Sequence, residues 1–310
     1  MKVLIIGGFG FIGKHVLENI PDTHTVAVFS DPASAEQNQS FAKEHRLQVI
    51  TGDITNPTQI TETFRAQNPD VTIHLAALTG LTKCNLDSSL AFSINVFGTY
   101  NVIMGCVAAK SKLVFISSRE VYGEGNPTGR TTEETELKPN NVYGTTKMLA
   151  EDLMHWAKSR YGLKYTILRL TNVYGPGGEQ YNIQAMIRSA KERGLVPLYG
   201  GNQLMNLVYV NDVATVIINC LTNPRTTDEV FNVGSDEDMT VEAIVKELIS
   251  QLPMPVQIQR MPMRTGETIS FRPDLQKMNA LFADLPKTSF QEGIRKTISA
   301  HHDTAAPQRN

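Results

Sequence analysis

The amino-acid sequence predicts an α/β protein built on a doubly wound parallel sheet, with a smaller mixed α/β domain toward the C-terminal end. Three observations carry this prediction. Short apolar segments alternate with helical segments, the first apolar segment ends in a run of glycines, and later apolar segments end in polar residues. In such sheets, ligands bind beside the carboxyl ends of the strands, so these polar residues indicate where a functional site lies.

The first strand ends in a glycine-rich turn. Val3 to Ile6 are apolar, and glycines follow at the spacing G-x-x-G-x-x-G. Without side chains, the backbone can approach a pyrophosphate and direct the N–H groups of the next helix toward it. A tight turn without a ligand is the alternative, but the position after a strand favours a Rossmann-type dinucleotide site. The residues expected in this site are Gly7, Gly10, Phe11, Ile12 and Gly13.

The second strand, expected over residues 24–29, ends at Ser30-Asp31-Pro32. An acidic residue about twenty positions beyond the glycines holds the ribose hydroxyls in NAD-binding folds. Asp31 lies 18 positions after Gly13 (31 − 13), and the next cation, which NADP would need nearby, is Lys43. NAD is therefore favoured over NADP. The alternative is that Asp31 only starts a turn before Pro32.

The alternation of strands and helices continues to residue 170 and then breaks down beyond Glu179. Strands are expected at 47–51, 71–75, 113–116 and 166–170, and helices from Pro57, over 89–109 and over 143–161. Later helices are expected at 181–194 and from 212, 240 and 289, with strands at 196–199, 207–210 and 231–233. We therefore expect a Rossmann domain at 1–175 with a return around 205–235, a second region at 176–300 and a frayed tail at 301–310.

Polar residues at one strand end and one helix start suggest acid–base chemistry. The fifth strand leads into Ser118, Arg119 and Glu120, and a later helix opens with Tyr143 and Lys147. A tyrosine and a lysine four residues apart share one helix face. The ammonium group stabilises the phenolate and lowers the pKa of the tyrosine from its usual value of about 10, so the tyrosine can act as a base near neutral pH.

Composition narrows the range of partners. A formal net charge of -2 gives no electrostatic attraction to nucleic acid or to an anionic membrane. Met1 leads directly into a strand and no apolar run approaches the roughly 18 residues of a membrane span, so we expect no signal peptide, no membrane partner and a cytoplasmic protein. Cys84, Cys106 and Cys220 are expected to be reduced and buried, and the seven histidines show no ligand spacing that predicts a metal.

With these residues assembled, the chain resembles the extended short-chain dehydrogenase/reductases, and among them the NAD-dependent nucleotide-sugar epimerase/dehydratase family typified by UDP-galactose 4-epimerase. The resemblance covers essentially residues 1–300. It rests on the order of several motifs: Gly7/Gly10/Gly13, Gly52-Asp53-Ile54, His74-Leu75-Ala76-Ala77, Asn95-Val96-Phe97-Gly98-Thr99, Ser118 with Tyr143-x-x-x-Lys147, and Asn172-Val173-Tyr174-Gly175-Pro176-Gly177.

The resemblance implies roles for individual residues. Tyr143 would accept a proton, Ser118 would hydrogen-bond the sugar hydroxyl being oxidised, and Lys147 would bind the nicotinamide ribose. Asn172 would contact the substrate and Asp53 the adenine. Further residues of the NAD site would be Ile54, Leu75, Ala76, Ala77 and Asn95. The resemblance also implies a nucleotide-diphosphate sugar as substrate, bound mainly by residues 176–300, and a homodimer formed by the helices at 89–109 and 142–161.

The chain departs from the family pattern at three places. Ser30 stands where an acidic residue usually follows the second strand, and Met205 stands where an arginine usually binds the diphosphate. The diphosphate would then rest on Arg264, with Arg260 or Arg272 as further candidates. Arg119-Glu120 is the third departure, since epimerases usually have small residues there, dehydratases an acid before the glutamate, and decarboxylases a serine before it.

The leading hypothesis is an enzyme that holds NAD tightly, oxidises a nucleotide sugar at C4, and returns the hydride to the opposite face, which is 4-epimerisation. A first alternative is a dehydratase in which Glu120 removes the C5 proton. A second alternative, from a different class, is a non-catalytic sensor or scaffold that binds a dinucleotide. The set Ser118, Tyr143 and Lys147 argues against this second alternative.

Overall fold

A sheet of seven parallel strands forms the larger part of the molecule. The computed structural model describes residues 1–178, 182–263, 270–285 and 287–303. The strand order is β10-β6-β5-β4-β1-β2-β3, so the chain adds strands first on one side of β1 and then on the other. This arrangement confirms the predicted doubly wound sheet and puts its switch point between β1 and β4. The strands are β1 Lys2–Ile6, β2 Thr25–Ser30, β3 Gln48–Thr51, β4 Val71–His74, β5 Lys112–Ser118, β6 Tyr165–Leu170 and β10 Glu229–Val233.

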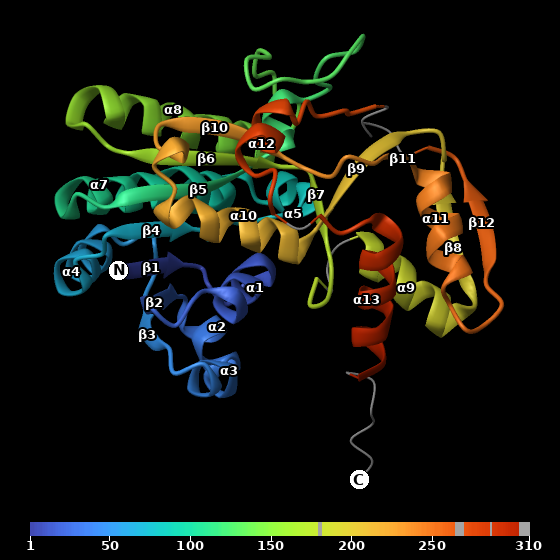
Figure 1. Ribbon diagram of the computed structural model, residues 1–310, viewed down its shortest axis with the longest axis horizontal. Coiled ribbons are helices and arrows are strands. Elements are labelled where there is room, and N and C mark those ends of the chain that lie inside the picture. Colours follow the sequence, from blue (N-terminus) through green and yellow to red (C-terminus); the bar gives the residue numbers. More distant parts are fainter. Residues whose placement is uncertain (179–181, 264–269, 286, 304–310) are drawn as a thin grey trace.

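Helices cover both faces of this sheet because its strands carry apolar side chains on both faces. In β1, Val3 and Ile5 join a core with α1 and α10, whereas Leu4 and Ile6 join a second core with α4, α7 and α8. Figure 1 shows α7 beside the sheet on one side and α10 with α1 on the other. The helices around the sheet are α1 Phe11–Asn19, α2 Pro32–Gln37, α3 Gln39–Glu44, α4 Pro57–Gln67, α5 Leu81–Leu86, α6 Ser88–Phe92, α7 Thr99–Ala109, α8 Val142–Tyr161 and α10 Val210–Thr222, with short 3₁₀ turns at Arg119–Tyr122 and Pro224–Thr226.

The single helix expected at 89–109 is interrupted. A π-helical turn, Ser93–Gly98, separates α6 from α7, and such turns often occur at functional sites. Within the described ranges, Ser88–Ala109 is one helical stretch whose length and apolar composition would suffice to cross a membrane. It packs against α4 and α8 in this fold, and the core helix of a globular domain passes the same test.

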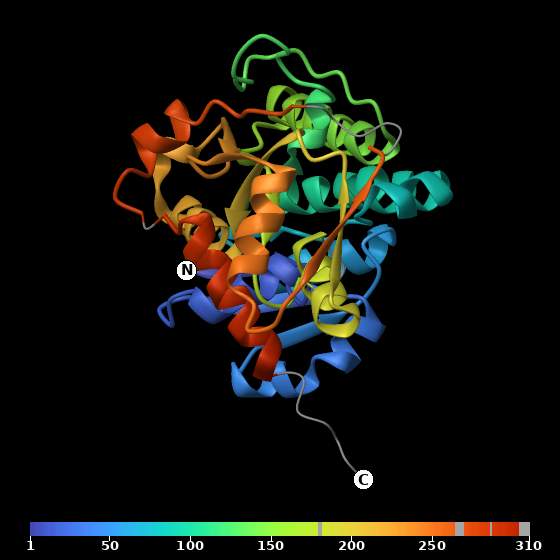
Figure 2. The same ribbon diagram turned by 90° about the vertical axis from the view of Figure 1, so that its right-hand side faces the viewer.

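The C-terminal region is a smaller mixed α/β unit with its own core. It contains the sheets β11-β9-β7 and β12-β8. Figure 1 shows α9, α11 and α13 with β8, β11 and β12 at one end of the molecule, and in Figure 2 this end faces the viewer. The elements are β7 Asn172–Tyr174, α9 Asn182–Arg193, β8 Leu195–Tyr199, β9 Leu204–Tyr209, β11 Asp238–Thr240, α11 Val241–Ser250, β12 Gln257–Met261 and α13 Phe290–Asp303. Helix α12, Gln276–Leu281, instead packs against β10 of the large sheet.

The expected tail at 301–310 needs a correction at its start. Helix α13 continues through Asp303, so residues 301–303 are helical, and residues 304–310 lie outside the described residues. The helix extends because its apolar face, which includes Ile294 and Ile298, packs into the core of the C-terminal region.

Candidate active site

The glycine turn after β1 has the geometry of a pyrophosphate cradle. Gly7 has a φ of +80°, and a Cβ on it would lie 2.6 Å from the backbone nitrogen of Ala76. A Cβ on Gly13 would lie 2.3 Å from the carbonyl oxygen of Gly8, so Gly13 lets helix and turn pack closely. Gly10 is exposed, and the first turn of α1 carries no acidic residue. An anion can therefore approach the N-terminus of α1 unopposed, and the turn fits a dinucleotide.

The segment after β4 lies beside this cradle. The backbone N–H groups of Leu75 and Ala76 both donate to the carbonyl oxygen of Ile6, at 2.9 and 3.0 Å. Leu75, Ala76 and Ala77 are half-buried, so their small or apolar side chains line the turn without filling it. This arrangement brings three of the residues expected at the NAD site next to the glycines.

The residues expected around the adenosine end lie at the ends of β2 and β3. The Asp31 carboxylate caps helix α2 by accepting the Ser34 N–H at 2.9 Å, as the turn interpretation predicts. Burial alone would raise the pKa of Asp31, but the hydrogen bonds from Ser34 lower it. Asp53 is exposed, and Ile54 is buried against Gly98. Their contacts with a cofactor stay predictions.

Lys147 lies buried between the end of β5 and Tyr143. Its Nζ donates to the carbonyl oxygen of Ile116 at 2.8 Å and lies 4.7 Å from the ring centre of Phe115 and 5.9 Å from that of Tyr143. Burial lowers the pKa of Lys147 to about 8, against an opposing contribution from Glu151. Helix α8 begins here because Asn141 caps it, accepting the Gly144 N–H at 2.8 Å. The structure thus brings the ammonium group to the tyrosine ring, as the four-residue spacing predicts.

Ser118 ends β5 and is joined to the start of α8 through Glu120. The Ser118 hydroxyl accepts the Glu120 N–H at 3.2 Å. One oxygen of the Glu120 carboxylate forms an ion pair with the Arg119 guanidinium at 2.6 Å, and the other accepts a hydrogen bond from the Asn141 amide at 2.7 Å. The Arg119 guanidinium also lies 5.3 Å from the ring centre of Phe271. Both oxygens of the candidate base are therefore engaged by protein donors.

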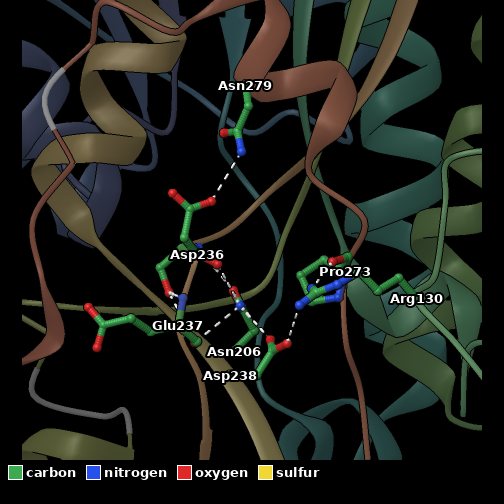
Figure 3. Close-up of polar contacts among 8 residues, drawn as sticks. Arg130, Asn206, Asp236, Glu237, Asp238, Pro273 and Asn279 are labelled. Carbon is green, nitrogen blue, oxygen red and sulfur yellow. Dashed lines mark hydrogen bonds and ion pairs between the residues drawn. The ribbon is translucent and has the colours of Figure 1, made fainter.

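Asn172 lies in β7, at the junction with the C-terminal region. Its side-chain amide donates to the carbonyl oxygen of Asn206 at 3.3 Å. The Asn206 amide in turn donates to the Asp238 carboxylate at 3.0 Å, which pairs with Arg130 at 3.0 Å (Figure 3). These bonds hold β7, β9 and β11 together behind the expected substrate residue.

The three arginines that are candidates for binding the diphosphate differ in what the structure shows of them. Arg264 lies outside the described residues. Arg260 is exposed on β12 and pairs with Glu242 at 2.8 Å, and Arg272 is exposed. Met205 lies in β9 and packs against the C-terminal core. At the position where the family usually has an arginine, this chain therefore has an apolar side chain, Met205, that packs against the hydrophobic core of the C-terminal region.

Asn95 is buried in the π-helical turn, and its amide is used within the protein. Its oxygen accepts the Leu78 N–H at 2.7 Å, and its nitrogen donates to the Leu78 carbonyl and the Thr146 hydroxyl, each at 3.0 Å. Asn95 therefore ties the segment after β4 to the helix that carries Tyr143 and Lys147. Any effect of Asn95 on a cofactor runs through the segments that it joins.

Sequence reasoning missed a buried ion pair behind the site, Glu151 with Arg169, at 2.6 Å. The signal that could have found it is the i, i+4 spacing of Tyr143, Lys147 and Glu151 on one helix face. The three cysteines are free and buried, as expected. Among the described residues, no group of three His, Cys, Asp or Glu side chains could hold a metal ion.

The sequence of this chain matches the model of the NAD dependent epimerase/dehydratase family over residues 3–234. The chain belongs to this family. NAD is therefore its cofactor, as predicted, and the glycine cradle fits it. Membership also confirms the predicted family and its fold.

Among the proteins similar to this chain, some are named epimerases and others are named dehydratases. The dTDP-D-glucose 4,6-dehydratase of Mus musculus is 28% identical over 316 residues, which cover 96% of this chain and 87% of that protein. The UDP-glucose 4-epimerase of Thermus thermophilus, solved in complex with NAD, is 28% identical with a TM-score of 0.85, covering 99% of this chain and 100% of that one. Pal from Bacillus thuringiensis is 26% identical with a TM-score of 0.89, covering 98% and 100%. Family membership thus leaves isomerase and lyase activity both open.

Proposed function

We propose that this protein is an NAD-dependent nucleotide-sugar epimerase that inverts C4 of the sugar through transient oxidation at that carbon. When bound, NAD supplies the hydride acceptor and donor for C4. The names of the similar proteins, which specify dTDP-glucose and UDP-glucose, support a nucleotide-diphosphate sugar as substrate. The reactive end of the sugar would lie beside Ser118 and Tyr143, at the carboxyl end of β5.

The side chains of the site support proton transfer at the C4 hydroxyl. In this proposal the Tyr143 Oη accepts the hydroxyl proton and later returns it, and the Ser118 Oγ hydrogen-bonds the same oxygen. The Lys147 ammonium, 5.9 Å from the centre of the Tyr143 ring, stabilises the phenolate. Asn172 contacts the sugar from β7, and Arg119 and Arg264 are proposed as further substrate contacts.

The NAD-binding role is assigned to residues at the strand ends. Gly7, Gly10 and Gly13, with the N-terminus of α1, hold the pyrophosphate. Asp31 receives the adenosine ribose, and Asp53 lies beside the adenine. The remaining proposed contacts are Phe11, Ile12, Ile54, Leu75, Ala76, Ala77, Asn95, Tyr143 and Lys147.

The observation that favours epimerisation over dehydration is that both carboxylate oxygens of Glu120 are already bound by other side chains of the protein. Elimination of water needs a carboxylate free to take the C5 proton and an acid for the leaving hydroxyl. Here Arg119 and Asn141 occupy the two oxygens of Glu120, at 2.6 and 2.7 Å. Arg119 is itself a poor acid, since a guanidinium does not readily release its proton.

Dehydration remains the second candidate, because Glu120 stands two residues after Ser118 and only 13% of its side chain is exposed to solvent. If the substrate displaced Arg119 or Asn141, the freed carboxylate would face the same end of the sheet. One residue would then serve first as base and then as acid.

Product analysis tests the proposal. The enzyme is incubated in deuterated water with UDP-glucose, UDP-galactose, their N-acetyl forms or dTDP-glucose, and the product is analysed by mass spectrometry and NMR. The expected product is an epimer of equal mass with no deuterium at C5. A product lighter by one water, lost in Glu120→Gln, would assign the protein to the dehydratases, and NAD binding without turnover of any substrate would support a sensor.

We also propose that the protein is a homodimer. Large apolar side chains are exposed on the helices from α5 to α8, and Trp156 lies 6.3 Å from Tyr100 and 5.4 Å from Tyr161 between ring centres. Exposed aromatic and apolar side chains gathered on neighbouring helices often mark an interface. This surface is formed by Leu81, Leu86, Leu90, Phe92, Phe97, Tyr100, Trp156 and Tyr161.

A further inference from the structure

A buried ion pair lies directly behind the candidate active site. Glu151 of α8 is fully buried, and the side chain of Arg169 in β6 is only 5% exposed. The guanidinium donates to Glu151 from Nε at 3.1 Å and from Nη2 at 2.6 Å. A buried pair of this kind brings little net stability compared with apolar residues of the same volume, so its presence calls for another explanation.

The Glu151 carboxylate is also the meeting point of three elements. The Ser117 hydroxyl, in β5, donates to its Oε1 at 2.5 Å, and Arg169 binds from β6. Ser117 directly precedes Ser118, and Arg169 lies three residues before Asn172. Glu151 itself shares α8 with Tyr143 and Lys147. One carboxylate therefore connects α8, which carries Tyr143 and Lys147, with β5, which carries Ser118. It also binds β6, the strand that directly precedes Asn172 of β7.

The ion pair is anchored further on the Arg169 side. Arg169 Nη1 donates to the Tyr122 hydroxyl at 2.8 Å, and that hydroxyl donates to the Asn232 side chain at 2.7 Å. Asn232 belongs to β10, the edge strand of the sheet. The guanidinium is therefore fixed in place by the sheet, and it fixes the carboxylate in turn.

The same carboxylate acts on Lys147, one helical turn away. Lys147 is buried with a backbone carbonyl and two aromatic rings around its ammonium, and in the described part of the chain it forms no ion pair. Burial lowers its pKa to about 8, and the largest contribution in the opposite direction comes from Glu151. Without that charge, burial would favour the neutral amine more strongly.

We propose that Glu151 is a positioning residue that locks Ser118, Tyr143, Lys147 and Asn172 into one arrangement, and that its negative charge stabilises the Lys147 ammonium. This inference rests on the functions proposed above for those four residues. Arg169 holds the carboxylate in place, and Ser117 orients it.

The other groups that face Lys147 cannot replace Glu151. His74, in β4, is held neutral because burial lowers its pKa to about 3. Cys84, in α5, is a thiol whose pKa is raised by burial, so it is uncharged near neutral pH. Tyr143 carries charge only as the phenolate that Lys147 itself stabilises. Glu151 is the carboxylate that raises the pKa of the Lys147 ammonium against the effect of burial.

The experiment measures the titration of Lys147 directly. Protein labelled with ¹³C at the lysine Cε and stripped of cofactor is titrated by NMR, and the Lys147 signal is assigned by its loss in Lys147→Met. Glu151→Gln keeps the side-chain shape and removes the charge. Because that variant leaves Arg169 buried without its partner, Glu151→Gln/Arg169→Met provides a second variant with no buried charge left over. Asp152→Asn, at an exposed position on the same helix, is the matched control.

The expected result is a Lys147 titration about one pH unit lower in Glu151→Gln and unchanged in Asp152→Asn. The lowering is smaller in Glu151→Gln/Arg169→Met, because this variant also removes the positive charge of the guanidinium. An unchanged Lys147 titration in a folded Glu151 variant, or an equal shift in the control, would overturn the proposal. The NMR titration needs no sugar substrate, so its outcome does not depend on whether the proposed epimerase reaction takes place.

Turnover gives a second measurement. A shift of one unit predicts a loss of kcat/KM in Glu151→Gln that is about tenfold larger at pH 9 than at pH 6, because the ammonium is lost earlier on the alkaline side. A role in packing alone would lower kcat/KM by the same factor at both pH values, and that result would also overturn the charge assignment.

Discussion

The backbone of Gly144 lies directly against the carbonyl oxygen of Glu120: a Cβ on residue 144 would stand 2.3 Å from that oxygen. Gly144 follows Tyr143 in the first turn of α8, and Glu120 follows Ser118 by two residues at the end of β5. The contact therefore sets the spacing between the two segments that carry the proposed base and the proposed hydroxyl donor. Even a methyl group would force them apart.

Gly144→Ala tests this spacing. Because the added Cβ would clash with the backbone of Glu120, which no side-chain rotation can relieve, we expect a shift of the first turn of α8, a loss of at least about tenfold in kcat and a destabilisation of roughly 1–3 kcal/mol. Turnover and thermal unfolding measure the two effects. Asp152→Ala, exposed on the same helix, should change neither, and wild-type turnover in Gly144→Ala would contradict the prediction.

Removal of the proposed base gives a second prediction. Tyr143→Phe keeps the ring near Lys147 but deletes the hydroxyl, so turnover should fall by about 10²–10⁴ while NAD affinity changes little. Lys147→Ala should lower both, because the ammonium is expected to bind the ribose as well as to stabilise the phenolate. Steady-state kinetics and calorimetric titration with NAD separate the two variants. Wild-type turnover in Tyr143→Phe would remove the assignment.

The large sheet was predictable because its strands are buried on both faces and read as apolar runs ending in glycine or polar residues. Each strand of that sheet was expected within a few residues of its observed bounds. The short helices α2, α3 and α5 and the three-residue strands β7 and β11 were not, since their stability comes from caps and tertiary contacts rather than from periodicity. The π-helical turn at 93–98 also leaves the apolar pattern of one continuous helix unchanged.

The candidate site likewise contains features that the sequence predicts and features that it does not. The spacing of Tyr143 and Lys147 and the glycine turn are local patterns, so sequence alone brings them out. The engagement of Glu120 by Asn141 and of Glu151 by Arg169 joins residues 21 and 18 positions apart across packed elements. Such contacts follow from the arrangement of helix and sheet, which the one-dimensional pattern does not contain.

Cofactor preference depends on whether Asp31 does more than cap α2. Its carboxylate should favour NAD over NADP, since a 2′-phosphate beside it meets like-charge repulsion. Asp31→Asn separates the two functions, because asparagine caps helices about as well as aspartate but carries no charge. We expect the stability of this variant to stay near wild type and its preference for NAD to narrow, measured by calorimetry on stripped protein. If the preference for NAD over NADP were unchanged in Asp31→Asn, the only role left for Asp31 would be to cap helix α2.

Stability should depend on pH through Lys147. The pKa of this lysine falls from 10.5 to about 8 on folding, so between these values the unfolded chain binds more protons than the folded one. Stability therefore rises with pH across this window. Compared with Lys147→Met, whose residue 147 does not titrate, the stripped wild-type protein should gain roughly 2 kcal/mol between pH 7 and pH 9.5. Urea unfolding of both proteins measures this gain, and parallel curves would contradict it.

The last prediction concerns the apolar surface on α5 to α8. Single exposed apolar residues are common, but on these neighbouring helices Phe97 is 66% exposed and Leu86 82% exposed, together with Tyr100, Trp156 and Tyr161. If two copies bury this surface against each other, Phe97→Glu places a charge in the interface and should convert the dimer to monomer at micromolar concentration. Met263→Glu changes a residue that is 47% exposed in the C-terminal region, outside this surface, and should leave the dimer intact. Sedimentation velocity compares the three proteins, and a wild-type protein that sediments as a monomer would exclude this interface.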